Sequence, residues 1–211
     1  QRLQAETGDP AAKARASDIE ATLKRLTRLS ERLMQLARAE GGRLRLEQVS
    51  DLRPVAHILA DELSRTVGAD RISLSLPADP LMSDLDPDVF AILYRNLVEN
   101  ALRHGADGTP IHVSLASDGV LTVANDGPVV PNETLARLAD RFERAGKLRD
   151  GSGLGLAIVH AIAQRIGSAL VLKSPRPGQD SGFEACLTLP TTMSDNNLLI
   201  GSGSRFGNSP S

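Results

Sequence analysis

Two asparagines, an arginine and a histidine are spaced so that one face of a helix could carry all four side chains. They lie at offsets of 0, 4, 7 and 8, which share one side of a helix: Asn96, Asn100, Arg103 and His104. Amide oxygens are hard ligands that Mg²⁺ accepts beside water and phosphate oxygens, and arginine and histidine can donate to phosphate. The face could therefore hold a metal–phosphate group, and an ordinary solvated face is the alternative.

Three glycines at spacing two, Gly151, Gly153 and Gly155, lead directly into an apolar stretch. Glycines let the backbone approach a ligand closely, and the N-terminus of a following helix offers free N–H groups to phosphate. The run is neither a Walker loop, since no Lys-Ser or Lys-Thr pair follows, nor a dinucleotide-binding turn, since no strand immediately precedes it. Upstream, a strand ends in Asn125 and Asp126 before a Gly-Pro pair, which alone would be an ordinary turn.

The elements that must position these residues are two helices and a hairpin. Asp86 and Pro87 suit the start of a helix that runs to about His104. Asp118-Gly119 favours a hairpin between strands at 111–116 and 120–124. Grouped strands with irregularly alternating helices predict an α+β fold: a two-layer α/β sandwich with a mixed sheet covered by helices on one face. Further helices are expected at 51–67, 131–142 and 153–166, and further strands at 44–46, 71–76, 170–172 and 183–189.

The N-terminal region predicts a long helix that ends at Gly41-Gly42. One apolar stripe recurs close to heptad spacing. A helix of about 30 residues with a single stripe needs a partner, because it is not stable alone in water. That partner is a second helix of a hairpin or of another subunit, or else the helix packs on its own domain. The stripe consists of Ile19, Leu23, Leu26, Leu29, Leu33 and Leu36.

Composition and charge exclude several classes of partner. The net charge is −2 and aromatic residues make up 2%, so neither electrostatic attraction nor base stacking favours a nucleic-acid partner. The single cysteine, Cys186, cannot form an internal disulfide. No apolar stretch approaches the ~20 residues that span a bilayer. Because the sequence lacks an initiator Met, we expect it to be a piece of a longer protein.

Taken together and in order, these segments resemble sensor histidine kinases. Residues 96–104 resemble the N box of that family, 125–128 its G1 box, 141–144 its F box and 151–156 its G2 box. In the family these boxes build an ATP pocket that is shared with gyrase, Hsp90 and MutL. The similarity covers roughly residues 44–190, and the preceding helix resembles the second helix of the dimerisation and phosphotransfer hairpin.

The resemblance implies a role for each matching residue. Asn100 becomes the Mg²⁺ ligand, Asn96 helps to hold the phosphate–metal cluster, and Arg103 and His104 lie near the phosphates and the nucleoside. The usual G1 Asp, which accepts from the adenine amino group, aligns with Asn125, although a shift of one residue gives that role to Asp126. The other residues expected to bind ATP are Gly127, Phe142, Gly151, Gly153, Leu154, Gly155 and Leu156, and Val129 replaces a further glycine of the G1 box.

The resemblance also separates a kinase from its hydrolytic relatives. Gyrase-like ATPases carry a Glu as base for water where this sequence has Asn96, so water attack should be slow. The acceptor of the family, a His followed by an acidic residue, has no match, since the earliest histidine is His57 followed by Ile58. We therefore expect ATP binding without autophosphorylation. The alternatives are a gyrase- or Hsp90-like ATPase and a non-catalytic ATP-sensing dimerisation module.

The resemblance predicts three parts in the chain. Residues 1–42 are expected to be a partial dimerisation hairpin, 43–190 the ATP-binding domain, and 191–211 a disordered tail or a cloning scar. The implied cofactors are ATP and Mg²⁺. The implied partners are a response regulator receiver domain and a second copy joined through the N-terminal helix, and the parent is expected to be a bacterial inner-membrane protein with this portion in the cytoplasm.

Overall fold

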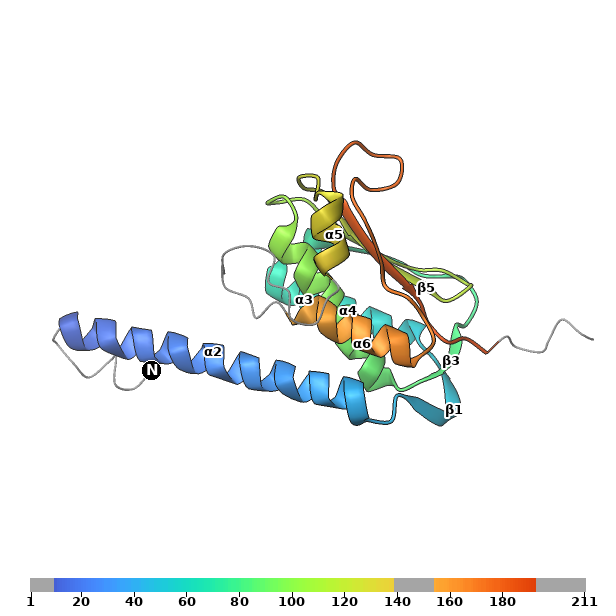
Figure 1. The fold of residues 1–211 in the computed structure, drawn as a ribbon, viewed down its shortest axis with the longest axis horizontal. Helices are drawn as coiled ribbons and strands as arrows, with labels where there is room; N and C mark the ends of the chain where they lie inside the picture. Colours follow the sequence, from blue (N-terminus) through green and yellow to red (C-terminus); the bar gives the residue numbers. More distant parts are fainter. Residues whose placement is uncertain (1–9, 139–153, 193–211) are drawn as a thin grey trace, which may run out of the picture.

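The computed structural model describes residues 10–138 and 154–192. A long helix precedes an α/β body (Figure 1). The helices are α2 (Pro10–Gly41), α3 (Arg53–Val67), the 3-10 turn η1 (Ala69–Arg71), α4 (Pro87–His104), α5 (Asn132–Leu138) and α6 (Gly155–Arg165). The strands are β1 (Arg45–Asp51), β2 (Ile72–Ser75), β3 (Met82–Leu85), β4 (Ile111–Leu115), β5 (Val120–Asn125), β6 (Val171–Lys173) and β7 (Phe183–Thr188).

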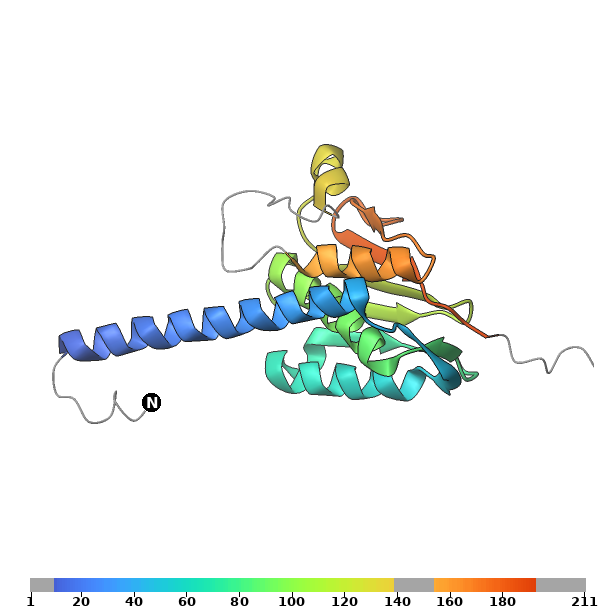
Figure 2. The same ribbon diagram turned by 60° about the horizontal axis from the view of Figure 1, so that its bottom comes forward.

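A mixed five-stranded sheet forms one layer of the body. Its order is β2-β4-β5-β7-β6, with β2 parallel to β4 and the other pairs antiparallel. Helices α3, α4 and α6 cover one face, with α4 between the other two (Figure 2). The predicted α+β fold is therefore confirmed. The core lies between these layers and includes Phe90, Leu93, Tyr94, Leu97, Val113, Leu121, Ile158, Ile162 and Leu187.

Helix α4 begins, and the β4–β5 hairpin turns, at the residues that the local sequence predicts. The Asp86 carboxylate accepts a hydrogen bond from the Asp88 N–H, which caps α4, and Pro87 occupies its first turn. In the hairpin, Gly119 has φ of +84° and the Asp118 carboxylate accepts from the Val120 N–H. Both signals act within a few residues, which is why the sequence could reveal them.

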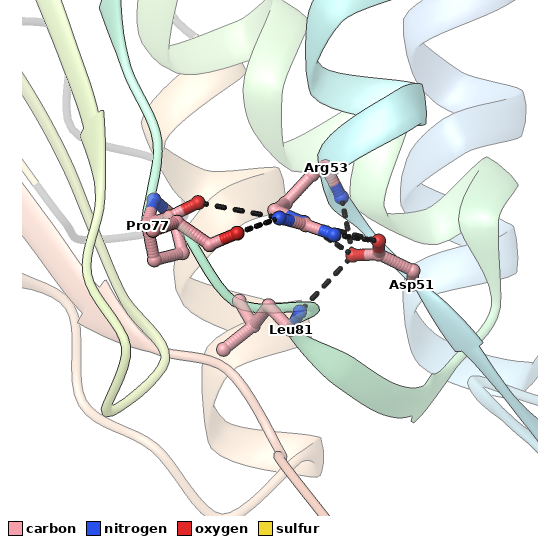
Figure 3. Close-up of polar contacts among 5 residues, drawn as sticks. Asp51, Arg53, Pro77 and Leu81 are labelled. Carbon is pink, nitrogen blue, oxygen red and sulfur yellow. Dashed lines mark hydrogen bonds and ion pairs between the residues drawn. The ribbon is translucent and has the colours of Figure 1, made fainter.

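A second, two-stranded sheet of β1 and β3 was only half predicted. Strand β1 is longer than the expected 44–46, and β3 was missed because its four residues follow Pro80 and carry little alternation. Asp51, the last residue of β1, joins this sheet to the start of α3 and to the segment before β3. Its carboxylate accepts from the Arg53 guanidinium at 2.8 Å and from the Leu81 N–H at 3.0 Å (Figure 3). Arg53 also donates to the Pro77 carbonyl at 3.4 Å.

The N-terminal helix packs on its own domain near its C-terminal end and leaves most of its apolar stripe exposed. Its final turns lie against α6, where Ala39 is buried and Arg165 donates to the Ala39 and Gly42 carbonyls at 2.7 and 2.8 Å. Arg38 pairs with Asp86 at 3.1 Å. Farther from the body the apolar stripe is exposed, at Ile19, Leu23, Leu26, Leu29 and Leu33. In the described ranges, none of the helices combines the length and apolarity that crossing a bilayer requires.

Candidate nucleotide-binding site

The four polar residues of α4 do not share one environment. Asn96 is 4% exposed, and its amide donates to the Ile92 carbonyl at 2.8 Å and to Gln35 Oε1 of α2 at 3.3 Å. Asn100 is half-buried, and Arg103 and His104 are exposed in the last turn. Hence Asn96 contacts the N-terminal helix, while the other three lie toward the C-terminal end of α4.

His104 lies at the surface, yet neighbouring groups partly desolvate it. This desolvation, followed by the positive charge of Arg103, lowers the pKa of His104 below its ordinary value. The neutral imidazole is therefore favoured at neutral pH, so this side chain can donate or accept one hydrogen bond there and adds no full positive charge. In the described residues, Arg103 supplies the cationic side chain of this last turn.

Asn125, at the end of β5, is a buried side chain with an unused acceptor. The residue is 1% exposed, and Nδ2 donates to the Asp126 carbonyl at 3.1 Å. Its Oδ1 is buried and has no hydrogen-bond partner among the described residues. Because a buried acceptor without a partner costs free energy, such an atom fits a site whose ligand supplies the donor. An adenine amino group is a donor of that kind.

The end of α4 and the end of β5 lie side by side. The Ala106 N–H donates to the Asp126 carbonyl at 2.7 Å. A β-carbon added to Gly105 would come within 3.3 Å of Asn125 Nδ2, and one added to Gly127 within 3.4 Å of the same atom. Glycine at both positions thus allows this close approach. The structure therefore brings the C-terminal end of α4 next to residues 125–127, while Asn96 lies against α2.

Asp126 is engaged by a residue that sequence reasoning missed. Its carboxylate pairs with Arg176 at 2.7 Å, from the connection between β6 and β7. In the same connection, the Gly182 N–H donates to the Gly127 carbonyl at 2.8 Å. No signal in the sequence points to Arg176, because it follows Asp126 by fifty residues in a polar turn.

The start of α6 is described only in part. Leu154 is half-buried at the N-cap position and no side chain caps this end of the helix, so its first N–H groups are not satisfied in that way. Gly155 begins the helix, and Leu156 is buried in the core. Phe142, Gly151 and Gly153 lie outside the described residues. Helix α6 packs directly on α4, which places its start near the Asn100 end of that helix.

In the described residues, no three His, Cys, Asp or Glu side chains gather where they could hold a metal ion. The amide of Asn100 is the metal ligand that the family resemblance implies. An amide oxygen suits Mg²⁺, which usually takes few protein ligands and completes its shell with phosphate and water oxygens.

Comparison with known proteins shows the family of the chain. The family model described as histidine kinase-, DNA gyrase B-, and HSP90-like ATPase matches residues 85–193, just over half of the chain. The chain belongs to this family. Within it, the chain carries the ATP-binding catalytic domain of a sensor histidine kinase, as the names of its relatives and the fold of its structural neighbours show.

Two similar curated proteins are longer than this chain. It is 32% identical over 189 residues to sensor protein QseC of Escherichia coli K12, covering 84% of this chain and 40% of QseC. It is also 32% identical to the histidine-protein kinase AfsQ2 of Streptomyces coelicolor, covering 74% of this chain and 29% of AfsQ2. The chain thus spans about two fifths of QseC.

Solved structures share the fold. The mycobacterial sensor histidine kinase MprB matches with a TM-score of 0.58 and 24% identity, covering 68% of this chain and 98% of that chain. Histidine kinase AdeS of Acinetobacter baumannii matches with a TM-score of 0.64 and 20% identity, covering 87% of this chain and 86% of that chain.

Proposed function

We propose that this domain binds Mg-ATP and transfers the γ-phosphoryl group to a histidine of a dimerisation hairpin, from which it passes to an Asp of a response regulator receiver domain. The observation that carries the proposal is the buried, unpartnered Oδ1 of Asn125 beside the end of α4. An acceptor there matches the adenine amino group, and this pairing would orient the phosphates toward the polar end of α4 and the start of α6.

Each part of the site would contribute positioning or charge. Asn100 would hold Mg²⁺, which supplies charge stabilisation to the transferring phosphoryl group when bound. Arg103 would donate to phosphate oxygens, and the uncapped N-terminus of α6 would offer N–H groups to the same anion. Asn96 would steady this arrangement through its contact with α2 as well as from within α4.

The transfer forms one bond and breaks one. An imidazole nitrogen of the acceptor supplies the electron pair for a new N–P bond, and the bond from Pγ to the bridging oxygen breaks with its electron pair left on ADP. The ring N–H proton leaves to a base or to solvent. Asn96 replaces the Glu that would activate water, which favours this transfer over hydrolysis.

We propose further that the chain itself contains no acceptor. His57 is exposed on α3 and is followed by Ile58, not by an acidic residue. His112 lies half-buried within β4 and His160 half-buried within α6. His104 is exposed at the end of α4 and is followed by a glycine. None of the four histidines has the acidic neighbour that marks the acceptor of the family, so labelling from radioactive ATP should be absent.

The division of the chain also stays a proposal: residues 1–42 as part of a dimerisation hairpin, 43–190 as the ATP-binding domain and 191–211 as a tail. The exposed stripe of α2 supports pairing with another helix, in a homodimer of the parent. For that parent we propose a bacterial inner-membrane protein that holds this portion in the cytoplasm.

Calorimetric titration with Mg-ATP tests the proposal. We expect saturable one-to-one binding, and Asn100→Ala should weaken it at least about tenfold in the presence of Mg²⁺, the size of one lost charge-assisted contact. Without Mg²⁺ the two proteins should bind ATP with similar affinity, which assigns the loss to the metal. Absence of binding by the unaltered chain would overturn the proposal, and rapid ATP hydrolysis would favour the gyrase-like class instead.

A further inference from the structure

Resting on the proposed function, the geometry points to Arg176 as a positioning residue for base selectivity. We propose that Arg176, acting through Asp126, locks the Asn125 amide with its oxygen toward the ligand, so that the site accepts a purine with an exocyclic amine and rejects one with an exocyclic oxygen. Adenine is the first kind of base and guanine the second.

The need for such a lock follows from the chemistry of the side chain at position 125. An ionised carboxylate only accepts hydrogen bonds, so it discriminates against an exocyclic oxygen in either orientation. An amide carries one acceptor and one donor group, and turning it over by 180° exchanges them. With Asn125 in place of Asp, selectivity for adenine therefore depends on what holds the amide.

The amide nitrogen is held by one hydrogen bond and lies in a narrow space beside two glycines. It donates to the Asp126 carbonyl at 3.1 Å. Added β-carbons on Gly105 and Gly127 would come within 3.3 and 3.4 Å of it, so the backbone of both glycines lies close to this atom. Turning the amide over would place Oδ1 against the Asp126 carbonyl oxygen, and two acceptors facing each other repel. The observed orientation therefore persists as long as the Asp126 peptide group stays in place.

The Ala106 N–H donates to the carbonyl of that peptide group, and Arg176 of the β6–β7 connection holds the side chain of the same residue. The guanidinium contacts the Asp126 carboxylate at 2.7 Å, and the Arg176 side chain is only 20% exposed. The backbone N–H of Arg176 donates to the Ser181 carbonyl at 3.0 Å, which closes the turn. At Gly182, where φ is +85°, an added β-carbon would lie 2.6 Å from Arg176 Cδ and 2.7 Å from the Asn125 carbonyl oxygen. The Arg176 stem and the backbone carbonyl of Asn125 thus both lie close to Gly182.

Ser174 holds the other end of the connection between β6 and β7. Its hydroxyl donates to the Gly182 carbonyl at 2.6 Å and accepts from the Val130 N–H at 2.9 Å. Together with the bond from the Gly182 N–H to the Gly127 carbonyl, these contacts fix the backbone on the far side of Asp126. Besides the Asn125 amide, two contacts reach Asp126 itself: Arg176 holds its carboxylate and the Ala106 N–H holds its carbonyl, each at 2.7 Å. Loss of Arg176 should therefore loosen Asp126 by removing one of these two contacts, while the other contacts of the β6–β7 connection remain.

The test measures dissociation constants of Mg-ATP and Mg-GTP by calorimetry and expresses selectivity as the Kd of GTP divided by the Kd of ATP. In Arg176→Met, which keeps the aliphatic stem, we expect this ratio to fall about tenfold, the value of one hydrogen bond. Arg176→Lys should restore most of it. Lys173→Met serves as matched control, because it removes an ion pair to Glu184 from the neighbouring strand and should leave the ratio unchanged.

A second background separates amide locking from other roles of Arg176. In Asn125→Asp the side chain cannot present a donor, so adding Arg176→Met should leave the ratio unchanged. An equal fall of the ratio in both backgrounds would overturn the proposal, as would an unchanged ratio in the single variant. A uniform change of both affinities would assign Arg176 to charge balance instead and also overturn it. Failure of the unaltered chain to bind any nucleotide would instead remove the proposed function itself.

Discussion

The ring and the hydroxyl group of Tyr94 have opposite effects on the stability of the fold. The side chain is 0% exposed, its ring lies 6.1 Å from that of Phe90 between centroids, and its hydroxyl has no hydrogen-bond partner among the described residues. Burial raises the pKa of Tyr94 well above its ordinary value. The ring stabilises the core, while the desolvated hydroxyl costs free energy.

Tyr94→Phe should therefore leave the free energy of unfolding unchanged or raise it by up to ~1 kcal/mol, because the ring stays and the unpaired hydroxyl goes. Urea unfolding followed by far-UV circular dichroism measures this. Tyr94→Leu, which removes the ring as well, is the control and should destabilise by more than about 1 kcal/mol. A clear loss of stability in the phenylalanine variant would mean that the hydroxyl is bonded in solution.

Among the elements, the Asp51 junction joins the two-stranded sheet to α3 and to the connection before β3. Hydrogen bonds from the Arg53 side chain, together with those from the Arg53 and Leu81 N–H groups, hold the pKa of Asp51 below its ordinary value, against desolvation by burial. The charged form of this carboxylate is thus favoured in the folded state. Its contribution to stability is fully present above the ordinary pKa of 3.8 and disappears as the pH falls through the lower folded value.

Replacing Asp51 with Asn should lower the free energy of unfolding at pH 7 by about 1–2 kcal/mol, since it weakens several charge-assisted hydrogen bonds. The difference from the unaltered chain should shrink as the pH falls below 3.8. Urea midpoints measured between pH 7 and pH 3 provide the test, with Asp84→Asn as a control from the same small sheet that pairs with Arg45. A difference that stays constant with pH would show that the Asp51 charge does not stabilise the junction.

At the scale of the whole molecule, the long helix meets the body near its C-terminal end. Arg165 donates to the Ala39 carbonyl in the last turn of α2 and to the Gly42 carbonyl just beyond the helix. The last carbonyl groups of a helix have no partner within it, so this contact stabilises the helix end. Arg165→Met should therefore loosen this end: we expect faster amide hydrogen exchange across residues 30–42 and little change in β4 and β5. Arg95→Met removes an exposed ion pair with Glu62 and should affect neither region. Unchanged exchange at the helix end would contradict this docking role.

The sequence could predict those parts of the molecule that depend on local chemistry. The Asp86 cap, the Asp118-Gly119 turn and the apolar face of α4 each act within a few residues. The resemblance to sensor histidine kinases added the assignment of the N, G1, F and G2 boxes in their order along the chain. It could not reveal that Asn96 contacts Gln35, because that contact joins residues 61 positions apart.

Nor could the sequence indicate Arg176, which is brought to Asp126 only when β7 pairs with β5. The choice between Asn125 and Asp126 as the adenine contact was open for the same reason. The structure pairs the Asp126 carboxylate with Arg176 and leaves Oδ1 of Asn125 without a partner among the described residues, which favours Asn125. Long-range pairing thus gives two adjacent residues different surroundings, which the sequence alone does not reveal.

The docking of α2 by one end also has a mechanical consequence. Its 32 residues form a rod about 48 Å long that, among the described residues, meets the body near its C-terminal end. A tilt of about ten degrees at that pivot moves the free end by about 8 Å, as a rod of this length and rise requires. Conversely, a sideways force applied to the helix near Pro10 would act on Arg38, Gln35 and Asn96 close to the pivot. The force there would be larger than at Pro10 by the ratio of the two distances from the pivot.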